Sequence, residues 1–123
     1  MAKVADSLIS LYKIALPFCE RKKIALNLDL IDPSLSTDQS QRQLTTNLKP
    51  YLQDAILRTK RNGTITIGAK NTSGKTIEIF IKDTGEAIPK AKRATLATTE
   101  NIDIHSRHGY GTTITLEYPK ATT

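Results

Sequence analysis

The apolar residues near the N-terminus recur at the spacing of one face of an amphipathic helix. Intervals of four, three, four and three residues separate Val4, Leu8, Leu11, Ala15 and Phe18. Because side chains at this spacing share one face of an α-helix, we predict a helix over residues 3–20. Pro17 lies near its predicted end, where a proline kinks or finishes a helix.

The period of the pattern changes to two after Lys23. Apolar residues at positions 24, 26, 28 and 30 alternate with mostly polar ones, as in a strand that buries one of its faces. A proline and two serines follow within residues 31–37, and these residue types favour a loop that closes the strand.

A second helical pattern begins after this loop. Either Asp38 or Ser40 supplies its N-cap, and the pattern ends at residues 62–63, an Asn-Gly pair. Pro50 falls inside the pattern, and a proline typically costs about 3 kcal/mol in a helix interior. We therefore expect a kink or two abutting helices near Lys49.

Four further alternating runs follow Gly63, and each has one apolar face. The inward sets are Ile65, Ile67 and Ala69; Ile77, Ile79 and Ile81; Ile102 and Ile104; and Ile114, Leu116 and Tyr118. Residues 89–100 predict a short third helix. This order favours a single α+β domain over residues 1–123, a two-layer sandwich in which about three helices cover one face of a mixed, mostly antiparallel five-stranded sheet.

Composition places the chain among ordinary globular proteins. It has 123 residues, 38% of them hydrophobic, and a net charge of 18 − 12 = +6. No apolar run reaches the roughly 18 residues that a membrane span needs, and the first residues lack the features of a secretory signal. The lone Cys19 excludes an intrachain disulfide and a cysteine-cluster metal site. We therefore expect a cytoplasmic protein.

The positive charge permits nucleic-acid binding but does not by itself predict it. The basic residues are dispersed, and the six aromatic residues (four Tyr, two Phe) form no stacking platform on an alternating strand. Nucleic acid is therefore the weakest of the partner hypotheses.

Two other motifs have simple structural interpretations. Residues 69–76 match a relaxed phosphate-binding loop, but such a loop needs a helix directly after it, and the alternation after Lys75 predicts a strand. We interpret this segment as a hairpin turn. His105 and His108 are the only histidines; no spacing with Cys19 supports a metal site or a nucleophile pair, so we expect solvated side chains.

Asp83 is the most informative polar residue. Strand parity places it on the same face as Ile79 and Ile81, so its carboxylate is predicted to point toward the helices. A carboxylate on the core side of a sheet needs hydrogen-bond donors. Backbone N–H groups of the following turn or the exocyclic amine of a ligand would each supply them, and the residues alone leave both interpretations open.

Three spaced blocks carry a resemblance to a known family. Residues 44–67 have the pattern of a helix with an N-box and a following strand, residues 83–89 (DTGEAIP) that of a first glycine box, and residues 102–119 that of a closing hairpin. Together they resemble the ATP-binding domain of sensor histidine kinases, in the GHKL superfamily of ATPases with its Bergerat fold. The family's element order agrees with the one predicted from the apolar pattern.

The resemblance implies a site for ATP and magnesium. It assigns Asp83 to the amino group of adenine, Thr112 to a supporting contact, and Gly85 to the close turn beside them. The family's magnesium ligand, an asparagine of the N-box, corresponds to Asp54, whose carboxylate oxygens also suit Mg²⁺.

The departures from the family pattern concern the phosphates. Two other polar N-box positions correspond to Pro50 and Leu57, which neither bind metal nor contact phosphate, and Ala87 replaces a second glycine. The second glycine box and the mobile lid have no counterpart, since residues 89–100 contain no glycine. The phosphates thereby lose backbone N–H donors and protection from water.

These departures lead to two hypotheses within the family. Lys90, Lys92 and Arg93 lie at the rim of the implied site, where exposed single charges contribute only about 0.2–1 kcal/mol each. The first hypothesis is a degenerate ATPase-like domain with weak or lost nucleotide binding and no catalytic residue. It would act as a regulatory or protein-interaction module in two-component-like signalling, with a response-regulator or kinase domain as partner; homo-oligomerisation stays open.

The alternative hypothesis is an active ATP- and Mg²⁺-binding catalytic domain of a sensor histidine kinase. It would need a separate phosphoacceptor domain, because we find no phosphoacceptor helix within the 123 residues. We therefore expect no autophosphorylation within this chain.

Overall fold

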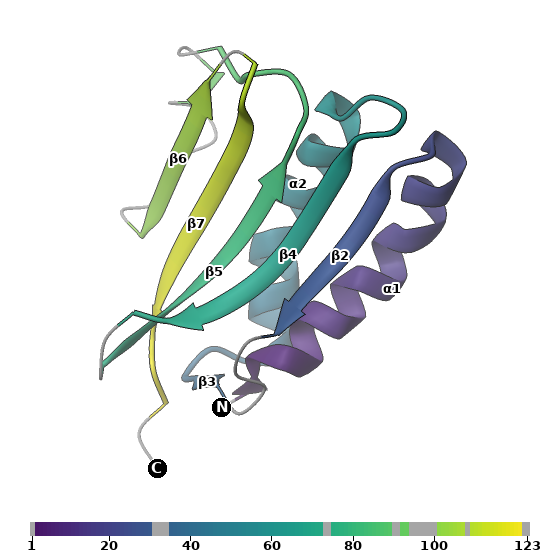
Figure 1. Cartoon of the computed structure of the whole chain (residues 1–123). Coiled ribbons are helices and arrows are strands. Elements are labelled where there is room, and N and C mark those ends of the chain that lie inside the picture. The colour runs from purple at the N-terminus through teal and green to yellow at the C-terminus, as the bar shows by residue number, and fades with distance from the viewer. Residues whose placement is uncertain are drawn as a thin grey trace.

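The computed structural model describes residues 2–30, 35–72, 75–89, 92–93, 101–107 and 109–121. Two helices, α1 (Val4–Lys22) and α2 (Gln41–Arg58), cover one face of a five-stranded sheet (Figure 1). The strands of this sheet are β2 (Ala25–Leu30), β4 (Thr64–Asn71), β5 (Thr76–Asp83), β6 (Ile102–Arg107) and β7 (Gly111–Pro119). Two short strands, β1 (Ala2–Lys3) and β3 (Ser36–Thr37), pair with each other.

The main sheet is mixed, with the strand order β2-β4-β5-β7-β6. The β2 and β4 strands are parallel, because α2 lies between them in the chain and returns it to the same end of the sheet. The other three neighbouring pairs are antiparallel. The predicted α+β two-layer sandwich with a mostly antiparallel sheet is therefore confirmed.

The two helices lie side by side and run in the same direction. Near their N-terminal ends, Gln41 Nε2 donates to Ser10 Oγ at 3.3 Å. Near their C-terminal ends, Lys22 Nζ donates to the backbone carbonyl of Ile56 at 2.7 Å and to that of Leu57 at 3.1 Å. A lysine at this place satisfies two carbonyls that the end of a helix leaves without a partner.

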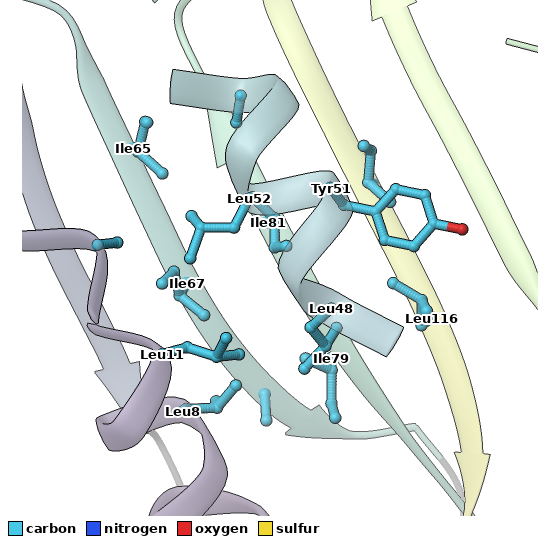
Figure 2. Packing of buried hydrophobic residues seen from close by; sticks show 14 of the residues in the cluster. Leu8, Leu11, Leu48, Tyr51, Leu52, Ile65, Ile67, Ile79, Ile81 and Leu116 are labelled. Atoms are coloured by element: carbon cyan, nitrogen blue, oxygen red, sulfur yellow. The ribbon is translucent and has the colours of Figure 1, made fainter. Parts of the chain in front are cut away.

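A single apolar layer fills the space between the helices and the sheet. Figure 2 shows its centre, where side chains from both helices meet side chains from three strands. All but Tyr51, Leu52 and Leu116 of the labelled residues are at most 1% exposed; the labelled set is Leu8, Leu11, Leu48, Tyr51, Leu52, Ile65, Ile67, Ile79, Ile81 and Leu116. The inward residues predicted from the alternation of β4, β5 and β7 are all buried, so the period-two pattern identified the core face of these strands correctly.

Both helices pass through their prolines. α1 continues beyond Pro17 to Lys22, close to its predicted end at residue 20, so Pro17 does not finish the helix. α2 is one helix through Pro50, so the alternative of two abutting helices is wrong, and the alternative of a kink stays a prediction. Both prolines are exposed. A carbonyl that loses its N–H partner on the solvent side of a helix can bond to water, which lowers the cost of the proline.

The ends of α2 differ in how well the sequence predicted them. Ser40 caps its start: the Ser40 hydroxyl accepts from the Gln43 N–H at 3.1 Å, and the Gln43 side chain accepts from the Ser40 N–H at 2.9 Å. The helix ends at Arg58, before the predicted residues 62–63. Thr59 is already extended, and its N–H and hydroxyl both donate to the Ala55 carbonyl. Because α2 ends here, Arg58 lies beside the end of β5 and the start of β7.

Two long helices are described on this face, and residues 92–93, inside the segment of the predicted third helix, are also helical. Of the segment 89–100, in which the third helix was predicted, only residues 89 and 92–93 belong to the described part of the chain. Within the described residues, neither helix combines the length and apolarity needed to cross a bilayer.

Candidate functional site

A polar cluster lies where the end of α2 meets the end of β5 and the start of β7. Asp83 is the last residue of β5 and stands opposite Thr112 of β7 in the antiparallel register. Arg58 is the last residue of α2. Asp83 and Thr112 are each 2% exposed, so both face the helix layer, and the orientation that strand parity predicted for Asp83 is confirmed.

The Arg58 guanidinium is at the centre of this cluster. Its Nη1 and Nη2 donate to the two carboxylate oxygens of Asp83 at 3.1 and 2.9 Å, a bidentate pair. Its Nε donates to Asp54 Oδ2 at 2.7 Å. Nη1 also lies within hydrogen-bond distance of Thr112 Oγ1, at 3.1 Å, and of the Glu86 carbonyl, at 3.0 Å. One side chain therefore connects every predicted polar side chain of the implied nucleotide site.

A further hydrogen-bonded chain extends from Thr112 into the sheet. The hydroxyls of Thr112 and Ser106 lie 2.7 Å apart, and Ser106 Oγ accepts from the Ile88 N–H at 2.7 Å. Arg93 holds the same region from outside, since its Nε donates to the Ile88 carbonyl and its Nη2 to the Ser106 carbonyl. The loop after β5 is thus fixed to β6 by two side chains.

Two glycines allow the close approach of backbone segments at the cluster. A Cβ on Gly85 would lie 2.6 Å from the Arg58 carbonyl oxygen, so only glycine permits this loop to pass the end of α2. The Gly85 N–H also donates to Asp83 Oδ1 at 2.9 Å, so the turn after β5 supplies one of the donors that this carboxylate needs. Gly111 has φ of +84°, and a Cβ there would overlap the Asp83 carbonyl.

Asp54, the implied magnesium ligand, has two cationic neighbours. Besides Arg58 Nε at 2.7 Å, Lys92 Nζ lies 3.6 Å from its other carboxylate oxygen. The Asp54 side chain is 10% exposed. Within the described residues, no group of three or more His, Cys, Asp or Glu side chains could hold a metal ion. Arginine and lysine thus neutralise the carboxylate that the resemblance assigns to Mg²⁺.

Burial and ion pairing act in opposite directions on the pKa values of this pair. For Arg58, burial lowers the pKa, but hydrogen bonds to Asp83 and Asp54 outweigh it, so the guanidinium pKa is raised and the group stays charged. For Asp83, burial raises the pKa of the carboxyl, and the hydrogen bond from Arg58 offsets this only in part. The ionised form of Asp83 therefore depends on Arg58.

The remaining candidate residues lie outside this cluster or have structural partners. His105 is exposed and lies 2.7 Å from Asp103, as expected for a solvated side chain, and His108 is not among the described residues. Cys19 is buried in the core. Lys75 precedes β5 rather than a helix, so the hairpin interpretation of residues 69–76 agrees with the pairing of β4 with β5.

Of the three basic residues predicted at the rim of the site, Lys92 and Arg93 belong to the described part of the chain. Lys92 and Arg93 have the contacts with Asp54 and with backbone carbonyls given above, so neither is a free charge beside the site. Lys90 and most of the segment in which the lid was predicted to be missing, residues 94–100, lie outside the described residues.

Comparisons with known proteins find relatives by structure rather than by sequence. No family model matches the sequence, and no curated protein matches it. The catalytic domain of histidine kinase ThkA superposes with a TM-score of 0.83 at 16% identity, over 97% of this chain and 93% of that one. The fold is that of a histidine kinase catalytic domain. The predicted GHKL-type fold is thereby confirmed.

Two larger structures contain the same fold. ThkA in complex with the response regulator protein TrrA superposes with a TM-score of 0.82 at 16% identity, over 98% of this chain and 41% of that one. Full-length ShkA in complex with AMPPNP superposes with a TM-score of 0.81 at 16% identity, over 99% of this chain and 31% of that one. At such identities the likeness establishes the fold, and the chemistry has to be argued from the residues of this chain.

Within the histidine kinase fold, the residues of this chain do not fit ATP and Mg²⁺ in the arrangement described. Arg58 donates to both oxygens of Asp83, and the Thr112 hydroxyl has Arg58 and Ser106 as partners. Arg58 and Lys92 neutralise Asp54. Adenine and magnesium would each have to displace an arginine from a largely buried ion pair.

Arg58 is the functional residue that the sequence analysis missed. There it was one of many dispersed positive charges. Its position four residues after Asp54 on a predicted helix was a signal for an ion pair, which the structure contains. Its pairing with Asp83, 25 residues later in the chain, has no counterpart in the local sequence.

Proposed function

We propose that this chain is a degenerate histidine kinase ATPase-like module that binds nucleotide weakly or not at all. It would act through protein contacts, as a regulatory module in two-component-like signalling. The observation that carries the proposal is the bidentate pair between Arg58 and Asp83. The Arg58 guanidinium donates to both oxygens of the carboxylate that, in this proposal, would otherwise bind the amino group of adenine.

The strength of the ion pair supports this proposal. The Arg58 and Asp83 side chains are 10% and 1% exposed, so adenine would have to separate a buried pair and leave Asp83 with a neutral amine as its partner. Breaking such a pair typically costs about 3–5 kcal/mol. A cost of that size lowers affinity by roughly two to four orders of magnitude.

Contacts with phosphate and magnesium would offset little of the affinity that is lost at the adenine. Leu57, which corresponds to a polar N-box position of the family, is 78% exposed and offers no donor to phosphate. Asp54 already faces Arg58 and Lys92. A divalent cation entering there would add two positive charges beside two others.

A domain with this fold that does not bind nucleotide can still act by binding another protein. Histidine kinase ThkA forms a complex with the response regulator protein TrrA, so a response regulator or kinase domain is the partner class that we propose here. We propose a cytoplasmic location on the same ground, because such signalling partners act there.

Calorimetric titration with Mg·ATP tests the proposal. We expect no saturable heat at micromolar nucleotide for the wild-type chain. The matched control is Asp83→Asn, which keeps the shape of the side chain and removes its charge. Low-micromolar binding by the wild type that disappears in Asp83→Asn would overturn the proposal.

The second candidate is an ATP- and Mg²⁺-binding catalytic domain that works with a separate phosphoacceptor domain. One observation favours it: Asp54, Asp83, Gly85 and Thr112 gather at one place around Arg58. In this case Arg58 would have to rotate away from Asp83 when nucleotide arrives. Transfer of labelled phosphate from ATP to a supplied phosphoacceptor domain would support this candidate over the first.

A further inference from the structure

An apolar groove follows the line along which α1 and α2 lie side by side, on the side of the helices away from the sheet. One hollow of about 200 Å³ is lined by residues of both helices, among them Ile14 and Phe18 of α1 and Gln53 and Ile56 of α2. A second hollow lies farther toward the N-terminal end of α2, where Ser10 of α1 faces the first turns of α2. We call these two hollows the α1–α2 groove.

Two large apolar residues that line this groove are about half exposed. Ile14 is 47% exposed and Phe18 is 52% exposed. They stand one turn apart on α1, so their side chains lie next to each other along the groove. Leaving two neighbouring large apolar side chains in water forgoes the stabilisation that burial would give, and such patches are characteristic of interaction sites.

The charges around the groove are all of one sign. Lys49 and Arg42 of α2 are the only charged residues that line the two hollows, all of whose lining residues belong to the described part of the chain. Arg21 adds a third positive charge, since its guanidinium lies 4.9 Å from the centre of the Phe18 ring. An apolar groove bordered by cations is complementary to an apolar stripe bordered by carboxylates.

We propose that the α1–α2 groove binds an acidic amphipathic helix of a partner protein. The apolar stripe of that helix would cover Ile14 and Phe18, and its flanking Glu or Asp residues would face Arg21, Arg42 and Lys49. Hollows in line between two neighbouring helices suit a helix, which places apolar residues at the i, i+3, i+4 and i+7 positions into them. This inference rests on the proposed function only in requiring a protein partner.

A second copy of this chain is a poorer occupant of the groove. A symmetric dimer through this face would bring Arg42 and Lys49 of one copy toward the same cations of the other. Like charges that meet in an interface oppose association. The groove therefore favours a partner of opposite charge over self-association.

Fluorescence anisotropy with designed peptides tests this inference. The probe is a labelled peptide of about 18 residues, long enough to form a helix, with leucines on one face and glutamates on both flanks. One control peptide replaces the glutamates by lysines, and another keeps the composition but scatters the leucines around the helix. We expect micromolar binding of the acidic amphipathic peptide and weaker binding of both controls by about tenfold or more.

Substitutions in the chain locate the site. Phe18→Ser should weaken binding of the acidic peptide by about tenfold or more, because it removes a large apolar contact. Lys49→Glu should weaken it severalfold and should reduce its dependence on salt. Leu57→Ser is the matched control: Leu57 is 78% exposed on α2 but does not line the groove, so its loss should leave binding unchanged. Circular dichroism checks that each variant is folded.

Three results would overturn the inference. Equal binding of the acidic and basic peptides would contradict the charge argument, and equal effects of Phe18→Ser and Leu57→Ser would contradict the location. A dimer in sedimentation experiments that Phe18→Ser dissociates would identify a second copy as the occupant instead. None of these experiments uses nucleotide. The Mg·ATP titration can therefore overturn the proposed function while the groove inference holds, and the peptide experiments can overturn the groove inference while the proposed function holds.

Discussion

Two regions of α2 contribute to the molecule in contrasting ways. Its middle packs Leu48, Tyr51 and Leu52 into the apolar layer above the sheet (Figure 2). Its last residue, Arg58, connects Asp54, Asp83 and Thr112 through hydrogen bonds. The core depends on volume and apolarity, which many side chains provide, whereas the cluster depends on one charged side chain of defined shape. The fold of a histidine kinase catalytic domain can therefore persist at 16% identity, because its core constrains volume and apolarity more than the identity of each side chain.

The largest effect should come from removing the centre of the cluster. Arg58→Ala leaves Asp83 and Asp54 without their main cationic partner, and loss of one member of a buried ion pair typically costs about 3–5 kcal/mol. Urea unfolding measures the change in the free energy of unfolding. Arg58→Lys is the control, because it keeps the charge but loses the bidentate geometry, and we expect a smaller loss.

The same variant should depend on pH in a defined direction. Without Arg58, the pKa of Asp83 rises further, so the folded state holds a proton that the unfolded state releases above about pH 4. The stability of Arg58→Ala should therefore fall, relative to that of the wild type, as pH rises from about 4 toward neutrality. A loss of stability that is the same at every pH would contradict the role assigned to the Arg58–Asp83 pair.

A substitution in the apolar core tests whether the core and the polar cluster stabilise the domain independently. Leu48 is fully buried, and truncating a buried leucine typically costs about 2–5 kcal/mol because apolar surface is lost and a cavity remains. Leu48→Ala should thus lower the free energy of unfolding by an amount similar to Arg58→Ala. Its effect should not change between acidic and neutral pH, and a marked pH dependence would show that the two regions are not independent.

The start of α2 should be less sensitive than its end. Ser40→Ala removes the side-chain oxygen that accepts from the Gln43 N–H, and loss of such a cap typically costs about 1 kcal/mol. Ser40→Asp should retain most of the stability, because its carboxylate can accept the same hydrogen bond. Thermal unfolding of the two variants beside the wild type provides the measurement.

The smallest effect should come from Lys92. Its ammonium lies 3.6 Å from the Asp54 carboxylate, but its side chain is 55% exposed. Exposed ion pairs of this kind contribute less than about 1 kcal/mol. If Lys92→Ala lowered the free energy of unfolding as much as Arg58→Ala, Arg58 would not be the residue on which Asp54 depends.

The sequence predicted the scaffold well because the scaffold follows local periodicity. The alternation at Ile77, Ile79 and Ile81 identified the buried face of β5, and the same parity placed Asp83 on that face. The sequence left open whether Pro50 lies within one kinked helix or between two abutting helices, because the cost of a proline depends on whether its side of the helix faces water. That is a property of the folded domain.

The contacts among the site residues were harder to predict than the residues themselves. Each of Asp54, Asp83, Gly85 and Thr112 was identified from the motif that it resembles. What lies between them is the Arg58 guanidinium, and its position depends on where α2 ends and how β5 and β7 start and stop against it. Such tertiary geometry has no periodic signature.

In the proposed function, Arg58 stays bound to Asp83 and nucleotide does not displace it. The most direct test follows the Arg58 Nε–H signal by ¹⁵N NMR while Mg·ATP is added, with Asp83→Asn as the control. We predict a signal protected from solvent exchange in the wild type, because Nε–H donates to Asp54, and no change in its position as nucleotide rises through the micromolar range. A saturable shift or loss of that signal at micromolar Mg·ATP, absent in Asp83→Asn, would contradict the account.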